Sequence, residues 1–227
     1  MSVLDLHPEF APFIGEYYND SEKTPIKILF IGESHYLPKE YNIDYKEWYE
    51  KNTDWFKRKY KIEEKHLSWI NTSKIIENDV VKGIPAKAHF IYTQIGDIYG
   101  NIFLDNKCYK EALKHIAFSN FFVRPAKGSF CKKDVLMALE NLLNNIKNTN
   151  PNKIIFISKT AYDKGFNEYS INDPKYLDLR SQIIVSICHT RCSEWELGYD
   201  KYNQAKGRQK LIDILISIRE KELSCKK

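Results

Sequence analysis

A short apolar run that leads directly into reactive residues constrains the fold of this chain most. Residues 28–31 are all apolar and end at Gly32, a pattern typical of a buried β-strand. The next four residues, 33–36, are Glu, Ser, His and Tyr, and each of them can take part in chemistry. Ligands of open α/β sheets bind beyond the carboxyl ends of the strands. We therefore expect these four side chains to belong to a functional site.

A second apolar run, residues 183–188, also ends in polar side chains. His189, Thr190 and Arg191 follow it directly. Two strand ends that carry reactive groups, far apart in the sequence, predict one site assembled from both halves of the chain.

The remaining pattern predicts an α/β protein. Residues 118–123 and 153–157 are expected to supply two more strands, and residues 40–116 form a helical insertion after the first strand. We expect a three-layer α/β/α sandwich with a central four-stranded, mainly parallel sheet. Helices are predicted at residues 8–19, 44–60, 66–76, 85–99, 107–116, 132–147 and 208–221.

Composition sets the outer limits of the prediction. The 227 residues are expected to form a single domain, 1–227, and the net charge of +5 permits polyanion binding without requiring it. Five cysteines at irregular spacing contain no C-x-x-C pair, so we expect reduced thiols and no metal site. Neither a signal peptide nor a membrane span is recognisable, which predicts a cytoplasmic monomer that does not contact a membrane.

Four short blocks together resemble the uracil-DNA glycosylase superfamily. The block IKILFIGESHY is similar to a family strand and its glycine-led active-site segment, with Gly32, Glu33 and Tyr36 in matching positions. FSNFFVRP places Asn120 where the family has its base-reading asparagine, and ICHTRCSEWE places His189 at the family histidine. NPNKIIFISKTAYD is similar to a further strand and the start of the following helix.

The resemblance implies a uracil-DNA glycosylase-like fold and excision of a base from single-stranded or damaged duplex DNA, with no metal or organic cofactor. The target base leaves the stack before it reacts. Asn120 would pair with the base edge, and Tyr36 would form a wall of the pocket. His189 would donate a hydrogen bond to the base carbonyl, and Glu33 would orient water or stabilise the sugar cation.

This chain departs from the family at several positions. Ser34 occupies the place of the catalytic aspartate, so Glu33 has to supply the negative charge. Trp195 lies near the family's wedge leucine position and is predicted to intercalate. Arg124 is expected to bind a phosphate or carboxylate. The predicted substrate-binding set is Gly32, His35, Tyr36, Asn120, Arg124, Thr190, Arg191 and Trp195.

Other interpretations of the same residues remain open. Without the aspartate, the chain is alternatively a catalytically silent nucleic-acid-binding module. Gly32-Glu33-Ser34 also resembles the Gly-Asp-Ser segment of SGNH hydrolases, in which Ser34 would be the nucleophile and His189 its base. That family carries an aspartate two residues before its histidine, whereas this chain has Ile187 there. Structural roles are possible too: Glu33 as a helix cap and Asn120 as a turn residue.

Overall fold

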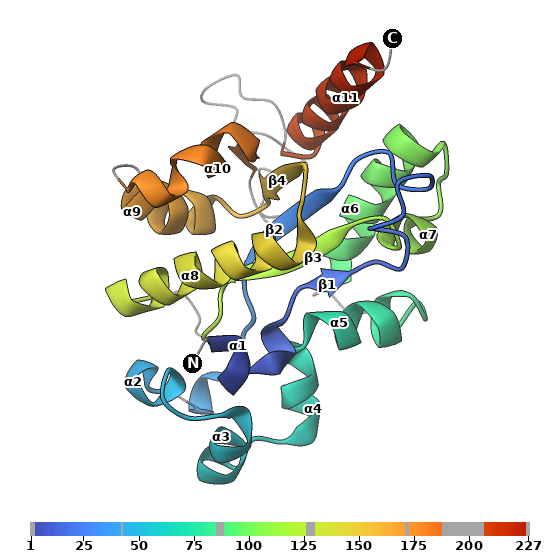
Figure 1. The fold of residues 1–227 in the computed structure, drawn as a ribbon. Helices are drawn as coiled ribbons and strands as arrows, with labels where there is room; N and C mark the ends of the chain where they lie inside the picture. Colours follow the sequence, from blue (N-terminus) through green and yellow to red (C-terminus); the bar gives the residue numbers. More distant parts are fainter. Residues whose placement is uncertain are drawn as a thin grey trace, which may run out of the picture.

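A computed structural model describes residues 3–41, 43–84, 89–125, 130–170, 173–187 and 207–225. Its centre is a sheet with strand order β1-β3-β2-β4-β5 (Figure 1). Strands β3, β2, β4 and β5 are parallel, and the two-residue β1 pairs antiparallel with β3 at one edge. The four predicted strands are thus present, with a fifth short strand added. The strands are β1 Phe13–Ile14, β2 Ile28–Ser34, β3 Ala117–Phe122, β4 Lys153–Phe156 and β5 Ile183–Ser186.

Helical elements cover both faces of the sheet. Between β2 and β3 every described element is helical, as predicted for the insertion. These elements are η2 Lys39–Tyr41, α2 Tyr45–Trp48, α3 Thr53–Tyr60, α4 Glu64–Leu67, η3 Ser68–Ile70, α5 Thr72–Lys74, η4 Ile75–Val80, α6 Phe90–Tyr99, η6 Gly100–Leu104 and α7 Tyr109–Leu113. The others are α1 Val3–Leu6, η1 Pro8–Phe10, α8 Lys132–Thr149, η7 Ala161–Asn167, α9 Glu168–Ser170, η8 Pro174–Tyr176, α10 Leu177–Gln182 and α11 Gly207–Cys225.

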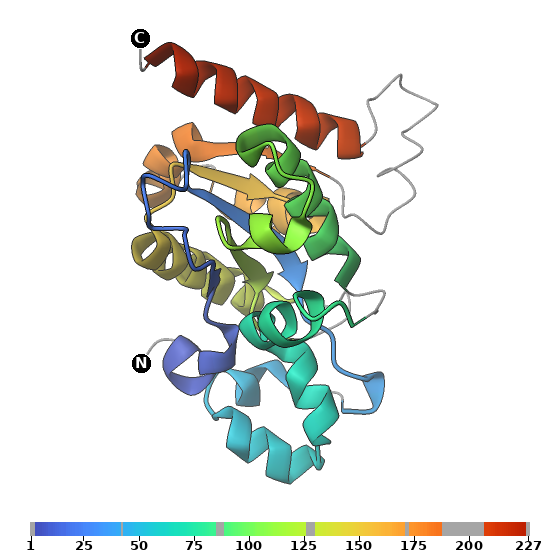
Figure 2. The same cartoon turned by 90° about the vertical axis from the view of Figure 1, so that its right-hand side faces the viewer.

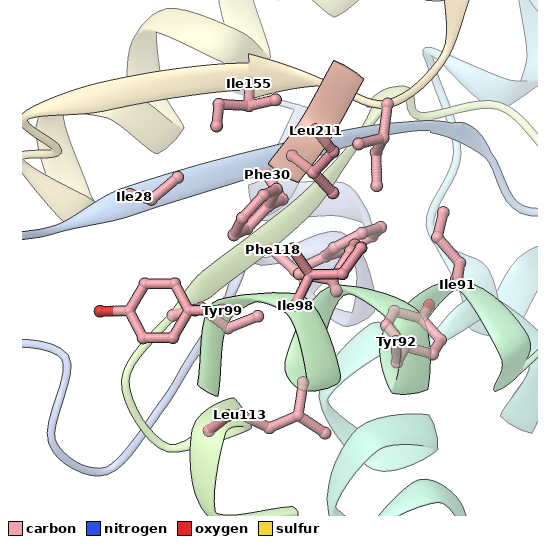
Figure 3. Close-up of a cluster of buried hydrophobic side chains, with 14 of the residues drawn as sticks. Ile28, Phe30, Ile91, Tyr92, Ile98, Tyr99, Leu113, Phe118, Ile155 and Leu211 are labelled. Carbon is pink, nitrogen blue, oxygen red and sulfur yellow. The ribbon is translucent and has the colours of Figure 1, made fainter. Parts of the chain in front are cut away.

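Alternation along β2 divides the core into two layers. Ile28 and Phe30 pack into a cluster with residues of α6, α7 and α11, and Figure 3 shows Phe30 and Phe118 facing α6. Leu29 and Ile31 point to the opposite face and pack with α8, η7 and α10. Because side chains of a strand alternate between faces, an uninterrupted apolar run indicates burial on both sides. The result is an α/β architecture with a helical layer on each face of the sheet.

The inserted helices also pack with the N-terminal segment in a third cluster. Trp48 and Phe56 are fully buried there together with residues of the N-terminal segment. In both views of the molecule, α3 and α4 lie at the opposite end from α11 (Figures 1 and 2). Among the described residues, no helix is both long and apolar enough to cross a bilayer.

Three predicted helices are wrong in detail. Residues 66–76 are divided among α4, η3, α5 and η4, because Asn71 is extended and caps the next helix through the Lys74 amide. Residues 8–19 form the η1 turn and strand β1, because Gly15 lies directly against the backbone of Lys114 and has no room for a Cβ. This close approach holds the segment extended beside β3. Residues 44–60 are divided into α2 and α3, since Asn52 caps the second helix through the Trp55 amide.

Candidate functional site

The predicted site residues lie at the carboxyl ends of adjacent parallel strands. Gly32 of β2 is paired with Asn120 of β3, and β4 flanks β2 on its other side. The chain passes from β2 to β3 on one side and then crosses to β4 on the other, so the winding direction reverses at β2. Crevices at such reversals are the usual ligand sites of open α/β sheets. Strand order therefore puts residues 33–36 where a ligand is expected.

Glu33 is held in place by two hydroxyl groups. Tyr36 Oη donates to Glu33 Oε1 at 2.7 Å, and Ser158 Oγ, just beyond β4, donates to Glu33 Oε2 at 2.9 Å. Partial burial of the ring, together with this bond to the carboxylate, raises the pKa of Tyr36 well above its usual range. Both carboxylate oxygens thus accept hydrogen bonds from fixed donors. Glu33 is an oriented carboxylate and not a helix cap.

Asn120 and His35 form a second polar unit. Asn120 Nδ2 lies 3.0 Å from His35 Nε2, and Thr72 Oγ1 lies 2.9 Å from the same nitrogen. His35 is buried, and burial lowers its pKa to about 4 despite a hydrogen bond to the Trp69 backbone. The imidazole is consequently neutral at pH 7.

These residues open onto a cavity of about 580 Å³, which is within the range of small-molecule sites. The strand ends form one side, and the inserted helical elements from η3 to α6 form the other. Tyr36 and Trp69 are 40% and 48% exposed and form part of its rim. The cavity is lined by Glu33, Ser34, His35, Tyr36, Ser68, Trp69, Ile75, Asp79, Ile84, His89, Ile91, Tyr92, Phe118 and Asn120.

Several lining residues were not found by sequence reasoning. Trp69, Asp79, His89 and Tyr92 all come from the insertion. His89 Nε2 lies 3.8 Å from Asp79 Oδ2, and His89 Nδ1 lies 2.9 Å from the Ile84 carbonyl oxygen. Their spacing follows no motif. The one available signal is the concentration of aromatic residues in this segment, which helix packing also produces.

Ser34 is engaged by the main chain. Its hydroxyl donates to the carbonyl oxygens of His35 at 2.8 Å and Arg124 at 3.1 Å. A serine nucleophile has to give its proton to a neighbouring base. The observed hydrogen bonds direct this proton to backbone instead, so the geometry gives the esterase alternative no support.

Arg124 does not line the cavity, although its carbonyl oxygen contacts Ser34, and its side chain is engaged elsewhere. Its Nε and Nη2 donate to Asp134 at 2.8 and 2.7 Å, and Nη1 donates to the Ile43 carbonyl at 3.3 Å. Burial disfavours the Asp134 charge, but bonds from Arg124, the Cys131 amide and Tyr49 hold the pKa of Asp134 below its usual value. The predicted carboxylate ligand of Arg124 is therefore internal, and we assign Arg124 a structural role.

Gly32 contributes to the site because it has no side chain. An ideal Cβ at this position would lie 2.4 Å from Asn120 Oδ1 and 2.9 Å from Phe118 Cζ. Glycine within a strand often marks such a close approach. Its absent side chain makes room for the Asn120 amide.

The other predicted residues, His189, Thr190, Arg191 and Trp195, lie outside the described residues. Within the described segments, no group of three or more His, Cys, Asp or Glu side chains is arranged to hold a metal ion. Comparisons with family models, curated proteins and solved structures gave no significant match. The chemistry of the cavity is therefore the basis for a functional proposal.

Proposed function

We propose that the cavity receives one unstacked base of DNA and that the chain hydrolyses its N-glycosidic bond, as the resemblance to uracil-DNA glycosylases implies. One observation carries the proposal. An amide and a carboxylate, both fixed by hydrogen bonds, share an aromatic cavity at the strand ends. Proteins that act on flipped bases read the base edge with polar groups and stack the ring on aromatic or apolar side chains.

Each part of the cavity has a role in this reaction. Asn120 supplies a donor and an acceptor for the base edge. Trp69, Tyr92 and Phe118 supply aromatic surface for the ring. Glu33 supplies negative charge near the sugar, where an oxocarbenium-like cation develops as the bond breaks.

The bond changes are those of a hydrolysis. The C1′–N bond breaks and its electron pair stays with the base, which takes up a proton. Water forms the new C1′–O bond and gives up a proton, for which the Glu33 carboxylate is the acceptor in this scheme. Tyr36 and Ser158 orient that carboxylate through its two oxygens.

The proposal is tested with single-stranded and mismatched oligonucleotides that carry deoxyuridine or another damaged base. We expect slow base release, seen as alkali-sensitive strand cleavage. Glu33→Gln should lower the rate by about 100-fold or more, because the charge is lost and the shape is kept. Glu16→Gln is the control, since Glu16 is exposed and outside the cavity.

Two outcomes contradict the catalytic proposal. An excision rate that Glu33→Gln leaves unchanged removes Glu33 from the reaction. No release from any substrate, together with salt-sensitive DNA binding, identifies a silent binding module instead.

A further inference from the structure

We propose that His35 determines specificity by holding the Asn120 amide in one orientation, so that the cavity offers a bound base a fixed order of donor and acceptor. The inference rests on the proposed function, because it concerns the base that the same cavity receives. His35 itself acts through Asn120 and is a positioning residue.

The contacts of His35 come from three separate parts of the chain. The ring is 6% exposed and lies against Phe10 at 5.5 Å between ring centroids. Its Nε2 atom faces Asn120 Nδ2 at 3.0 Å and Thr72 Oγ1 at 2.9 Å.

These contacts determine the tautomer. A neutral imidazole carries one N–H and one acceptor nitrogen. The Nδ2 group of Asn120 can only donate, so the Nε2 atom that it contacts at 3.0 Å is the acceptor and the ring hydrogen lies on Nδ1. Thr72 Oγ1, at 2.9 Å, can donate to the same nitrogen.

The same contact restricts the amide. Only the Nδ2 side of Asn120 can donate to an acceptor, so a rotated amide would bring Oδ1 against the Nε2 lone pair. On the other side of the amide, Oδ1 lies over Gly32, where an ideal Cβ would be 2.4 Å away. The Asn120 amide thus lies between His35 Nε2, which accepts a hydrogen bond, and Gly32, which has no side chain.

A fixed amide distinguishes bases by the order of their edge groups. One Nδ2 hydrogen is used by His35, and the second hydrogen and Oδ1 remain for a ligand. Uracil presents an acceptor at O4 next to a donor at N3, and cytosine presents a donor at N4 next to an acceptor at N3. An amide that cannot rotate therefore pairs its donor and acceptor with one of these two edges, and it places donor against donor and acceptor against acceptor on the other.

Binding measurements with three variants test the inference. The probes are single-stranded oligonucleotides with one 2′-fluorinated deoxyuridine or deoxycytidine, whose glycosidic bonds resist cleavage. We expect the Kd values of the wild-type protein for the two oligonucleotides to differ by about tenfold or more. His35→Phe should bring the ratio of the two Kd values towards one, while His35→Gln should keep it, since a glutamine carbonyl can accept from Nδ2. His115→Phe is the control, as His115 is a buried histidine of equal 6% exposure that bonds to Thr24.

A second measurement does not depend on any ligand. The ¹⁵N resonances of the imidazole in the full-length protein separate the protonated from the unprotonated nitrogen. We expect Nε2 of His35 to be unprotonated at pH 7. Protonated Nε2 would overturn the inference, as would a folded His35→Phe protein that retains the wild-type ratio. If neither oligonucleotide binds the wild type, the proposed function fails, and the resonances still decide whether His35 holds the amide.

Discussion

The contact between Gly32 and Asn120 makes a quantitative prediction about Gly32→Ala. Ordinary van der Waals contact begins at 3.4 Å, so the amide oxygen would have to retreat by 1.0 Å from its 2.4 Å position. The Phe118 ring, at 2.9 Å, has to move as well. Overpacking of this kind costs about 1–3 kcal/mol. The displaced amide also lengthens its 3.0 Å hydrogen bond to His35.

Urea denaturation of four proteins measures this effect: the wild type, Gly32→Ala, Asn120→Ala and the double variant. Removing the amide relieves the closest clash, so Gly32→Ala should be less destabilising in the Asn120→Ala background. Residues in contact couple by about 0.5–3 kcal/mol in such cycles. If the cost of Gly32→Ala is equal in both backgrounds, within about 0.5 kcal/mol, the amide does not lie over the glycine and the reasoning fails.

Two further predictions concern stability. Asp134→Asn leaves Arg124 buried without its counter-charge and should lower the free energy of unfolding by about 3–5 kcal/mol. Urea denaturation measures this loss, with Asp213→Asn at an exposed position as the control. A loss equal to that of the control would refute the prediction. His35 has a folded pKa of about 4 against an ordinary 6.5, so the unfolded chain binds the extra proton between these values and stability should fall on the order of 3 kcal/mol as the pH drops from 6.5 to 4. His35→Phe should show a shallower fall over that window, and an equal slope would contradict the assignment.

Local sequence patterns were sufficient for the four parallel strands of the sheet. The runs that begin at residues 28, 118, 153 and 183 each contain a strand, because a central parallel sheet is buried on both faces and its strands are therefore apolar without interruption. For the segment 8–19 the local pattern predicts the wrong structure. Its aromatic spacing suits a helix, but a tertiary contact at Gly15 decides its conformation.

The site was predictable where it follows directly from strands. Glu33, His35 and Tyr36 were identified from their places beyond a strand, and Asn120 from the family resemblance; all four line the cavity. The opposite wall was not predictable in this way. Trp69 and the other residues of the insertion reach the cavity through helix packing, which depends on contacts between segments that no local pattern records.

The role of Arg124 was also not predictable from the local sequence, although its partner is close in the chain. Its place next to a strand end suggested an external anion, yet its partner Asp134 lies only ten residues further along the chain. The ion pair depends on how α8 packs beside β3, and the sequence carries no separate sign of that packing.

The two walls of the cavity come from different kinds of structure. Strand pairing fixes the carboxylate and the amide, whereas the facing surface belongs to a helical segment inserted between β2 and β3. Grafting another segment between the same two strands would replace the ligand's outer surroundings and leave the inner polar platform in place. Relatives that differ in this insertion should therefore diverge in what they select before they diverge in the chemistry they perform.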